Sequence, residues 1–118
     1  MKDPKILITG GAGYIGSVLS EKLLSLGYAV TVLDTQMYNK TSLISCVQYG
    51  NKFNFIRGDV RNEPDLKKLV HGHDIVIPIA ALVGAPLCDK NPVDAELINY
   101  KHIKNICDWK SNHQWIIY

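Results

Sequence analysis

The fold is decided by residues 5–16, which read KILITGGAGYIG. Apolar residues 6–8 predict a buried strand, and the glycines that follow predict a tight turn that leads into a helix. Gly10 permits the turn, Gly13 lets a ligand approach the backbone, and Gly16 lets the helix pack closely on a sheet. Free amides and the helix dipole favour negative charge at such a helix start, so the stretch predicts a pyrophosphate-binding turn.

An acidic residue follows the next expected strand. Residues 29–33 form an apolar run, and Asp34 stands at its end. A carboxylate in this place can accept hydrogen bonds from both hydroxyls of an adenosine ribose and repels a 2′-phosphate, and residues 35–37 supply no arginine to compensate. Together with the turn, Asp34 therefore predicts binding of NAD rather than NADP. The alternative for Asp34 is a turn residue that ends a strand.

Strands and helices are expected to alternate along the whole chain. The expected strands are the apolar runs bounded by turn residues, at 5–9, 29–33, 53–56, 74–79 and 115–118. This alternation predicts an α/β fold with a Rossmann-type doubly wound parallel sheet of about five strands in the order 3-2-1-4-5. Pro78 removes an amide donor from the fourth strand, so either this strand ends early or its neighbour pairs with it only briefly.

Three helices are expected between these strands. The first ends near Gly27 and is expected to bury Ile15, Val18, Leu19, Leu23 and Leu26. The second begins near Asn62, has Pro64 in its first turn and ends at Gly72, with Leu66, Leu69 and Val70 buried. The third runs from about 92 to 110 with a buried stripe of Val93, Leu97, Tyr100, Ile103 and Cys107. A short helix is also expected at 41–49.

The composition is that of one globular domain spanning residues 1–118. The 13 basic and 11 acidic residues are scattered, so a nucleic-acid partner is not expected. Three cysteines without a CxxC spacing argue against disulfides and zinc and are expected to be buried thiols, and the four histidines form no metal-binding pair. The first apolar run is too short for a signal peptide or a membrane span, which predicts a cytoplasmic protein without a membrane partner.

Several motifs in a fixed order resemble one known family. After TGGAGYIG they are Leu33-Asp34, the RGDVR of 57–61, the AALVG of 80–84, Asn91-Pro92 and Asn99. In these motifs the chain is similar to the extended short-chain dehydrogenases/reductases, specifically the NAD-dependent nucleotide-sugar epimerases and dehydratases. The sequence departs from the family pattern at Pro78, where relatives commonly have His, and at Lys101-His102, where they commonly have a Gly nearby.

The resemblance implies a role for individual residues. Tyr14 and Ile15 would lie at the pyrophosphate, and Asp34 with the loop that begins at Thr35 would lie at the adenosine ribose. The remaining implied contacts are Asp59 and Val60 at the adenine, Ala80, Ala81 and Leu82 beneath the cofactor, and Asn99 near it. The alternatives are a strand end with a turn at 59–60, a buried strand end at 80–82, and an exposed asparagine without a role.

The resemblance also implies that catalytic residues are missing. The family's Ser or Thr follows the fifth strand and its Tyr-x-x-x-Lys lies on the next helix, but this chain stops at Tyr118, so its fold is expected to be incomplete relative to the family. Tyr100 and Lys104 have the same spacing but lie on the helix before that strand, and Tyr100 is expected in the core. No catalytic residue is therefore expected in the chain, and no turnover by the chain alone.

Two hypotheses for the function remain. In the first, the chain is the NAD-binding part of a nucleotide-sugar epimerase or dehydratase, which takes its nucleotide-sugar substrate only where a C-terminal part exists. In the second, it is a catalytically inactive NAD-binding module for sensing or assembly. A reading frame that continues past Tyr118 into a Tyr-x-x-x-Lys would favour the first. In either case a fifth strand left as a bare sheet edge predicts a homodimer.

Overall fold

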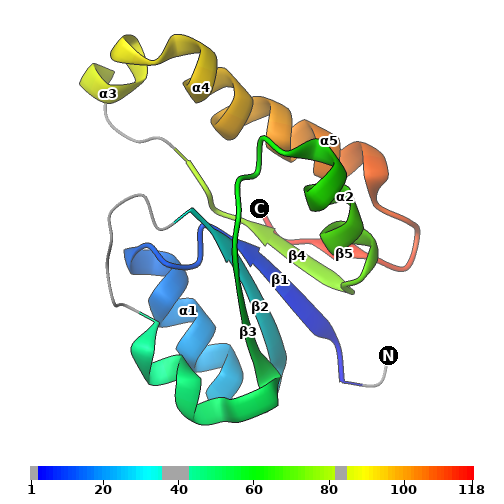
Figure 1. The fold of residues 1–118 in the computed structure, drawn as a ribbon. Helices are drawn as coiled ribbons and strands as arrows, with labels where there is room; N and C mark the ends of the chain where they lie inside the picture. The colour runs from blue at the N-terminus through cyan, green and yellow to red at the C-terminus, as the bar shows by residue number, and fades with distance from the viewer. Residues whose placement is uncertain (1–2, 36–42, 82–84) are drawn as a thin grey trace.

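Five parallel strands form one sheet in the order β3-β2-β1-β4-β5, which confirms the predicted topology (Figure 1). The computed structural model describes residues 3–35, 43–81 and 85–118, with only the backbone of 85–87. The strands are β1 (Lys5–Thr9), β2 (Ala29–Asp34), β3 (Phe53–Arg57), β4 (Ile75–Pro78) and β5 (Trp115–Ile116). All of them run toward the same edge, so the loops after their carboxyl ends meet there (Figure 1).

Helices cover both faces of the sheet (Figure 1). On one face, α1 (Tyr14–Ser25) and the 3-10 segment η1 (Ile44–Lys52) enclose a core with Ile6 and Ile8 of β1. On the other face, α2 (Glu63–His71) and α5 (His102–Trp109) enclose a second core with Leu7. This alternation along β1 is the period of two that a strand buried on both faces requires.

One continuous helical run precedes β5. It consists of α4 (Pro92–Glu96), the π-helical turn η2 (Leu97–Lys101) and α5, and it matches the predicted bounds closely. A further short helix, α3 (Ala85–Lys90), was not predicted. The expected helix at 41–49 overlaps η1, although its first two residues lie outside the described part of the chain.

The predicted buried face of α1 was partly wrong. Ile15, at 70% exposure, and also Val18 and Leu26 face outward, whereas the residues buried on the helix are Gly16, Ser20 and Leu24. Leu19 and Leu23 pack beside them as half-buried residues. The physical reason is close approach: Gly16 touches the backbone of Gly11, so small residues form the face nearest the sheet.

The predicted stripe on the third helix was also partly wrong, since only Leu97 and Ile103 of its five residues are half-buried. Tyr100 is 60% exposed, and Val93 and Cys107 are exposed as well. The buried face consists of Ile98, His102 and Ile106. A prediction based on apolar side chains alone misses this face, because its central residue is His102, whose two ring nitrogens are hydrogen-bonded.

The prediction for α2 was correct in its bounds, its cap and two of its three buried residues, since Leu69 is only half-buried. Asn62 caps the helix, its Oδ1 accepting from the Asp65 amide at 3.3 Å, and Leu66 and Val70 are fully buried. Gly72 provides the C-cap. The capping residue and the end glycine thus fix this helix locally, as expected.

Pro78 fits the sheet because pairing with β5 is brief. The Ile79 amide donates to Thr9 O on β1, and the Val76 carbonyl accepts from Ile117 beyond β5. Alternate residues of a parallel strand bond to opposite neighbours, so Pro78 faces the β5 side. The pairs described between β4 and β5 end at Val76–Ile116, and the next ladder bond would need an amide on residue 78, so Pro78 ends the pairing at this point.

Candidate functional site

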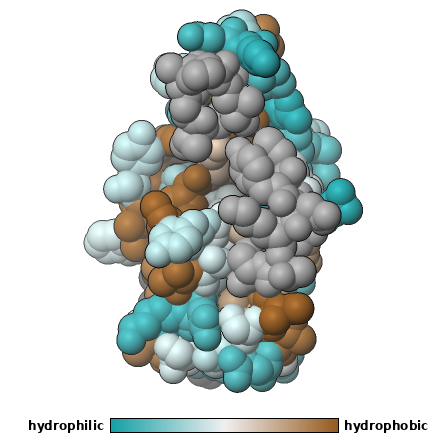
Figure 2. Space-filling model, turned by 90° about the vertical axis from the view of Figure 1, so that its left-hand side faces the viewer, coloured by the Kyte–Doolittle hydropathy of each residue, from teal (hydrophilic) through white to brown (hydrophobic). Residues whose placement is uncertain are grey.

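A cavity of about 340 Å³ opens at the carboxyl edge of the sheet. Its walls come from the glycine-rich turn (residues 10–16), from the ends of β2 and β3, and from the segment after β4. Figure 2 views the molecule from the side to which the strands point, and apolar residues lie exposed there between hydrophilic ones above and below. Ligands of open α/β sheets bind at this edge, where loops converge beyond the strands.

The glycine-rich turn forms one wall of the cavity. Gly10 has a φ of +78°, and a Cβ on it would lie 2.6 Å from the backbone of Ala80. A Cβ on Gly16 would lie 2.4 Å from Gly11 Cα, so this glycine is required by packing. At Gly13, by contrast, a Cβ would meet only Gly10 O at 3.5 Å, an ordinary contact. The protein itself leaves space at Gly13, on the side of the cavity.

The start of α1 faces the same space. Gly13 is its N-cap, and Tyr14, Ile15 and Gly16, its first residues, line the cavity. The first turn of this helix contains no acidic residue. The amides and the positive end of the helix dipole are therefore available to an anion.

Asp34 ties the end of β2 to the glycine-rich turn. Its Oδ2 accepts from the backbone amide of Ala12 at 3.0 Å, and both Asp34 and Thr35 line the cavity. The Gly10 amide adds a second link, donating to Leu33 O at 2.8 Å. The sequence predicted that Asp34 and the turn belong to one site, but nothing in the motif indicated the hydrogen bond from Ala12.

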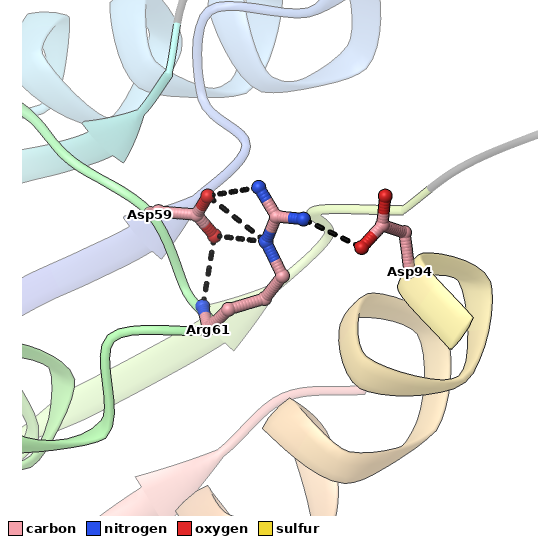
Figure 3. A network of polar contacts seen from close by, with 3 residues as sticks. All are labelled: Asp59, Arg61 and Asp94. Carbon is pink, nitrogen blue, oxygen red and sulfur yellow. Dashed lines mark hydrogen bonds and ion pairs between the residues drawn. The ribbon is translucent and has the colours of Figure 1, made fainter. Parts of the chain in front are cut away.

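Asp59, Val60 and Arg61 also line the cavity. The guanidinium of Arg61 lies between two carboxylates (Figure 3). Its Nε donates to both oxygens of Asp59 at 2.9 Å, and its Nη1 donates to Asp94 of α4 at 2.7 Å. Sequence reasoning assigned no role to Arg61, although its position two residues after Asp59 was a signal for this pairing.

Asp59 and Arg61 each stabilise the ionised form of the other. Hydrogen bonding from the Arg61 side chain lowers the pKa of Asp59 below the ordinary aspartate value, although partial burial acts in the opposite direction. The same hydrogen bond raises the pKa of Arg61, with a smaller effect from Asp94. An ionised network thus links the loop after β3, which lines the cavity, to Asp94 on α4.

The segment after β4 completes the cavity. Ala80 and Ala81 line it, as the predicted contacts beneath a ligand require, whereas Leu82 lies outside the described residues. Asn99 is exposed on η2, with its Nδ2 4.0 Å from Cys88 Sγ. Among the described residues of this helical run, Ile98 and not Asn99 lines the cavity.

A buried histidine stands behind the glycine-rich turn. His102 is 1% exposed, its Nε2 lies 3.1 Å from the Thr9 hydroxyl, and its Nδ1 lies 2.6 Å from Ile98 O. Burial lowers the pKa of His102 below the ordinary value, and the hydrogen bond to Ile98 O only partly opposes this. Sequence reasoning treated this residue as a departure from the family pattern and missed its contact with Thr9.

Other candidate residues lie away from the cavity. Tyr100 is exposed, and Lys104 forms an ion pair with Asp108 at 2.8 Å, so the expectation of a core position for Tyr100 was wrong. Cys46 is buried, but Cys88 is only half-buried and Cys107 is exposed, which corrects the expectation of buried thiols.

In the described ranges there is no group of three potential metal ligands. No helix among these residues is long and apolar enough to cross a membrane.

Known proteins are similar to this chain over most of its length. The model of a family described as "NAD dependent epimerase/dehydratase family" matches residues 6–115. A UDP-glucose 4-epimerase from Klebsiella pneumoniae is 39% identical over 82 residues, covering 66% of this chain and 59% of that protein. A crystal structure of UDP-glucose 4-epimerase from Stenotrophomonas maltophila, with bound NAD and formylated UDP-arabinopyranose, has a TM-score of 0.75 at 27% identity, covering 90% of this chain and 33% of that one.

A second solved structure of a UDP-glucose 4-epimerase is similar to this chain to nearly the same extent. The UDP-glucose 4-epimerase of Thermus thermophilus, in complex with NAD, has a TM-score of 0.73 at 27% identity over 89% of this chain and 33% of that chain. The present chain thus spans less than two thirds of the length of each of these relatives.

Proposed function

This chain belongs to the NAD dependent epimerase/dehydratase family, and on that premise we propose that it binds NAD in the cavity at the carboxyl edge of its sheet. The observation that carries the proposal is that the glycine-rich turn and Asp34 meet at one cavity and are joined by the hydrogen bond from Ala12. Two related epimerases are solved with NAD, which supports the same ligand here.

The phosphate and ribose ends of the cofactor have matching surfaces in the cavity. The pyrophosphate would approach Gly13, where the protein leaves space for it, and would face the free amides at the start of α1 beside Tyr14 and Ile15. The adenosine ribose would donate its hydroxyls to Asp34, with Thr35 next to it. A carboxylate at this point disfavours the additional phosphate of NADP, so we propose a preference for NAD.

The two bases would lie at opposite ends of the cavity. Adenine would lie against Asp59 and Val60, whose carboxylate and backbone suit an amine and a ring nitrogen. The nicotinamide end would lie over Ala80 and Ala81, where small side chains leave room. We propose Leu82 and Asn99 as further contacts at this end.

We propose that the activity belongs to a larger catalytic unit acting on a nucleotide sugar. In this proposal residues 1–118 are a single cofactor-binding domain. The hydride chemistry is that of the nicotinamide, and the protein contributes binding and orientation. We further propose that no residue of this chain takes the place of the family's catalytic Ser or Thr and Tyr-x-x-x-Lys. The supporting observation is that Tyr100 and Lys104 lie on the helical run before β5 and do not line the cavity.

The test combines a binding and an activity measurement on the 118-residue protein. Calorimetry is expected to give saturable binding of NAD and weaker binding of NADP. A coupled assay for interconversion of UDP-glucose and UDP-galactose is expected to give no turnover. Absence of NAD binding would overturn the proposed ligand, and turnover by the purified chain would overturn the proposed lack of catalytic residues. Binding without any effect on sugar chemistry in a longer form would favour a sensing or assembly module.

A further inference from the structure

His102 connects the helical run α4–α5 with the strand that enters the glycine-rich turn. Thr9 is the last residue of β1, directly before Gly10, and its side chain is fully buried. The Thr9 hydroxyl lies 3.1 Å from His102 Nε2, a contact between residues 93 positions apart in the sequence. The contact therefore reaches the turn from behind, through the core and not through the cavity.

The second ring nitrogen fixes the direction of this hydrogen bond. The carbonyl oxygen of Ile98 can only accept, so the Nδ1 atom 2.6 Å away must carry the ring proton. The pKa of His102 is lowered by burial, which keeps the ring neutral near pH 7, and Nε2 is then an acceptor. It follows that the Thr9 hydroxyl donates to Nε2.

The helix is built to hold the ring in this place. The His102 amide bonds to Leu97 O, five residues back, as the π-helical turn η2 requires, while the Ile98 carbonyl accepts from the imidazole. Ile98 itself lines the cavity. Helical π turns often occur at functional sites. Here the turn places one imidazole between a cavity-lining residue and the entrance to the glycine-rich turn.

We propose that His102 is a positioning residue for the glycine-rich turn: by holding the Thr9 hydroxyl through Nε2, it fixes where β1 passes into Gly10 and the amides beyond it. Gly10 has little freedom to adjust, because it packs against the backbone of Ala80 and has a positive φ. Displacement of Thr9 is thus passed on to the amides that face the cavity. The effect on a bound ligand rests on the proposed NAD binding, but the effect on the turn does not.

Replacing His102 by glutamine or by asparagine tests whether the protein needs a hydrogen-bond acceptor at the place of Nε2 or only a polar side chain at position 102. In His102→Gln the amide group can reach the place of Nε2, whereas in His102→Asn it reaches only the place of Nδ1. Thr9→Val removes the same hydrogen bond from the other side with nearly unchanged volume, so the test does not depend on one variant folding well.

The first readout needs no ligand. Amide hydrogen exchange and NMR shifts of Gly10, Gly11 and Gly13 are compared with those of Phe55 in β3. Thr9→Val and His102→Asn are expected to speed exchange and move the shifts at the turn while Phe55 is unchanged, and His102→Gln is expected to restore the wild-type values. Unchanged turn amides in both Thr9→Val and His102→Asn would overturn the inference.

The second readout is the ratio of ADP to adenosine binding. The free energy of one buried hydrogen bond is equivalent to roughly tenfold in affinity. Because the Thr9–His102 bond is not made to the ligand, this is the upper limit of its effect on binding, and His102→Asn is expected to lose up to about this much for ADP, which needs the turn, and less than about twofold for adenosine. An equal loss for both ligands would indicate a merely structural role and refute the positioning role. If the wild-type chain binds neither ADP nor NAD, the proposed function fails, whereas the ligand-free readout still decides the role of His102.

Discussion

Gly13→Ala is expected to weaken NAD binding strongly while leaving the fold intact. The added methyl group would meet only Gly10 O at 3.5 Å. The backbone of Gly13, with φ −73° and ψ −178°, is open to any residue. Alanine is a poorer N-cap than glycine, which costs less than about 1 kcal/mol, and the lower entropy of its unfolded state offsets about 0.4–1 kcal/mol. The melting temperature should therefore stay within about 4 °C of wild type.

The effect on the ligand is larger because the methyl group occupies the space of the phosphates. Gly13 lines the cavity, and the described protein atoms leave that side open. A phosphate displaced by a methyl group loses at least one charged hydrogen bond to the turn, worth about 1.5–3 kcal/mol. This corresponds to a Kd for NAD that is roughly ten- to hundredfold higher.

Gly16→Ala is the matched control. Its methyl group would lie 2.4 Å from Gly11 Cα and 2.6 Å from Gly10 O, both backbone atoms that cannot move aside. Overpacking of this kind costs about 1–3 kcal/mol, which lowers the melting temperature by about 4–12 °C in a domain of this size. Calorimetry with NAD and thermal melting are measured for both variants. Wild-type NAD affinity in Gly13→Ala, or a melting temperature as low as that of Gly16→Ala, would refute the reasoning.

Three further predictions concern charge and association. Asp34→Asn should weaken NAD about tenfold and reduce the discrimination against NADP in calorimetry, since a hydrogen-bond acceptor for the ribose is lost; unchanged NAD affinity would contradict the role of Asp34. Arg61→Gln removes the ion pair that lowers the pKa of Asp59. In the wild type this pair should stabilise the fold by at most about 1 kcal/mol at pH 7, given its exposure. The stabilisation should disappear as the pH falls below the ordinary aspartate pKa of about 3.9 and through the lowered pKa of Asp59. Urea titrations of wild type and variant at pH 7 and pH 3 measure this, and a difference that grows at pH 3 would reverse the assigned sign. The outer edge of β5, beside exposed Trp115, should pair with a second copy, giving a dimer in light scattering, and a monomer at every concentration would exclude it.

The sheet could be predicted because its determinants are local. Each strand is an apolar run bounded by turn residues, alternation with helices predicts a parallel doubly wound sheet, and the dinucleotide-binding turn favours the order 3-2-1-4-5. The cap at Asn62 and the end at Gly72 were predicted for the same reason. The buried faces of α1 and α5 could not be predicted, because tertiary packing decides them. On α1 close approach to Gly11 buries Gly16, and on α5 a hydrogen-bonded His102 replaces an apolar residue.

The candidate site was predictable only where the motif itself carries the geometry. The glycine-rich turn and Asp34 converge because a strand, a turn and the next strand end at the same edge. The Arg61–Asp94 pair joins two segments 33 positions apart, and the Thr9–His102 pair joins two that are 93 apart. No spacing rule connects such residues, so the sequence could mark Asp59 and His102 as notable without indicating that Arg61 bridges to Asp94 or that His102 contacts Thr9.

The charges of the cavity explain how an acidic site can suit an anionic ligand. Among the described lining residues, Arg61 carries the one positive charge, and its guanidinium is already shared between Asp59 and Asp94. Negative charge of a ligand must therefore be met by backbone amides and the dipole at the start of α1. These act only within the first helical turn, beside Gly13, and an additional phosphate on the adenosine ribose would instead face Asp34. In the proposed mode of binding, the same arrangement would accept a pyrophosphate at one point and reject a phosphate at another.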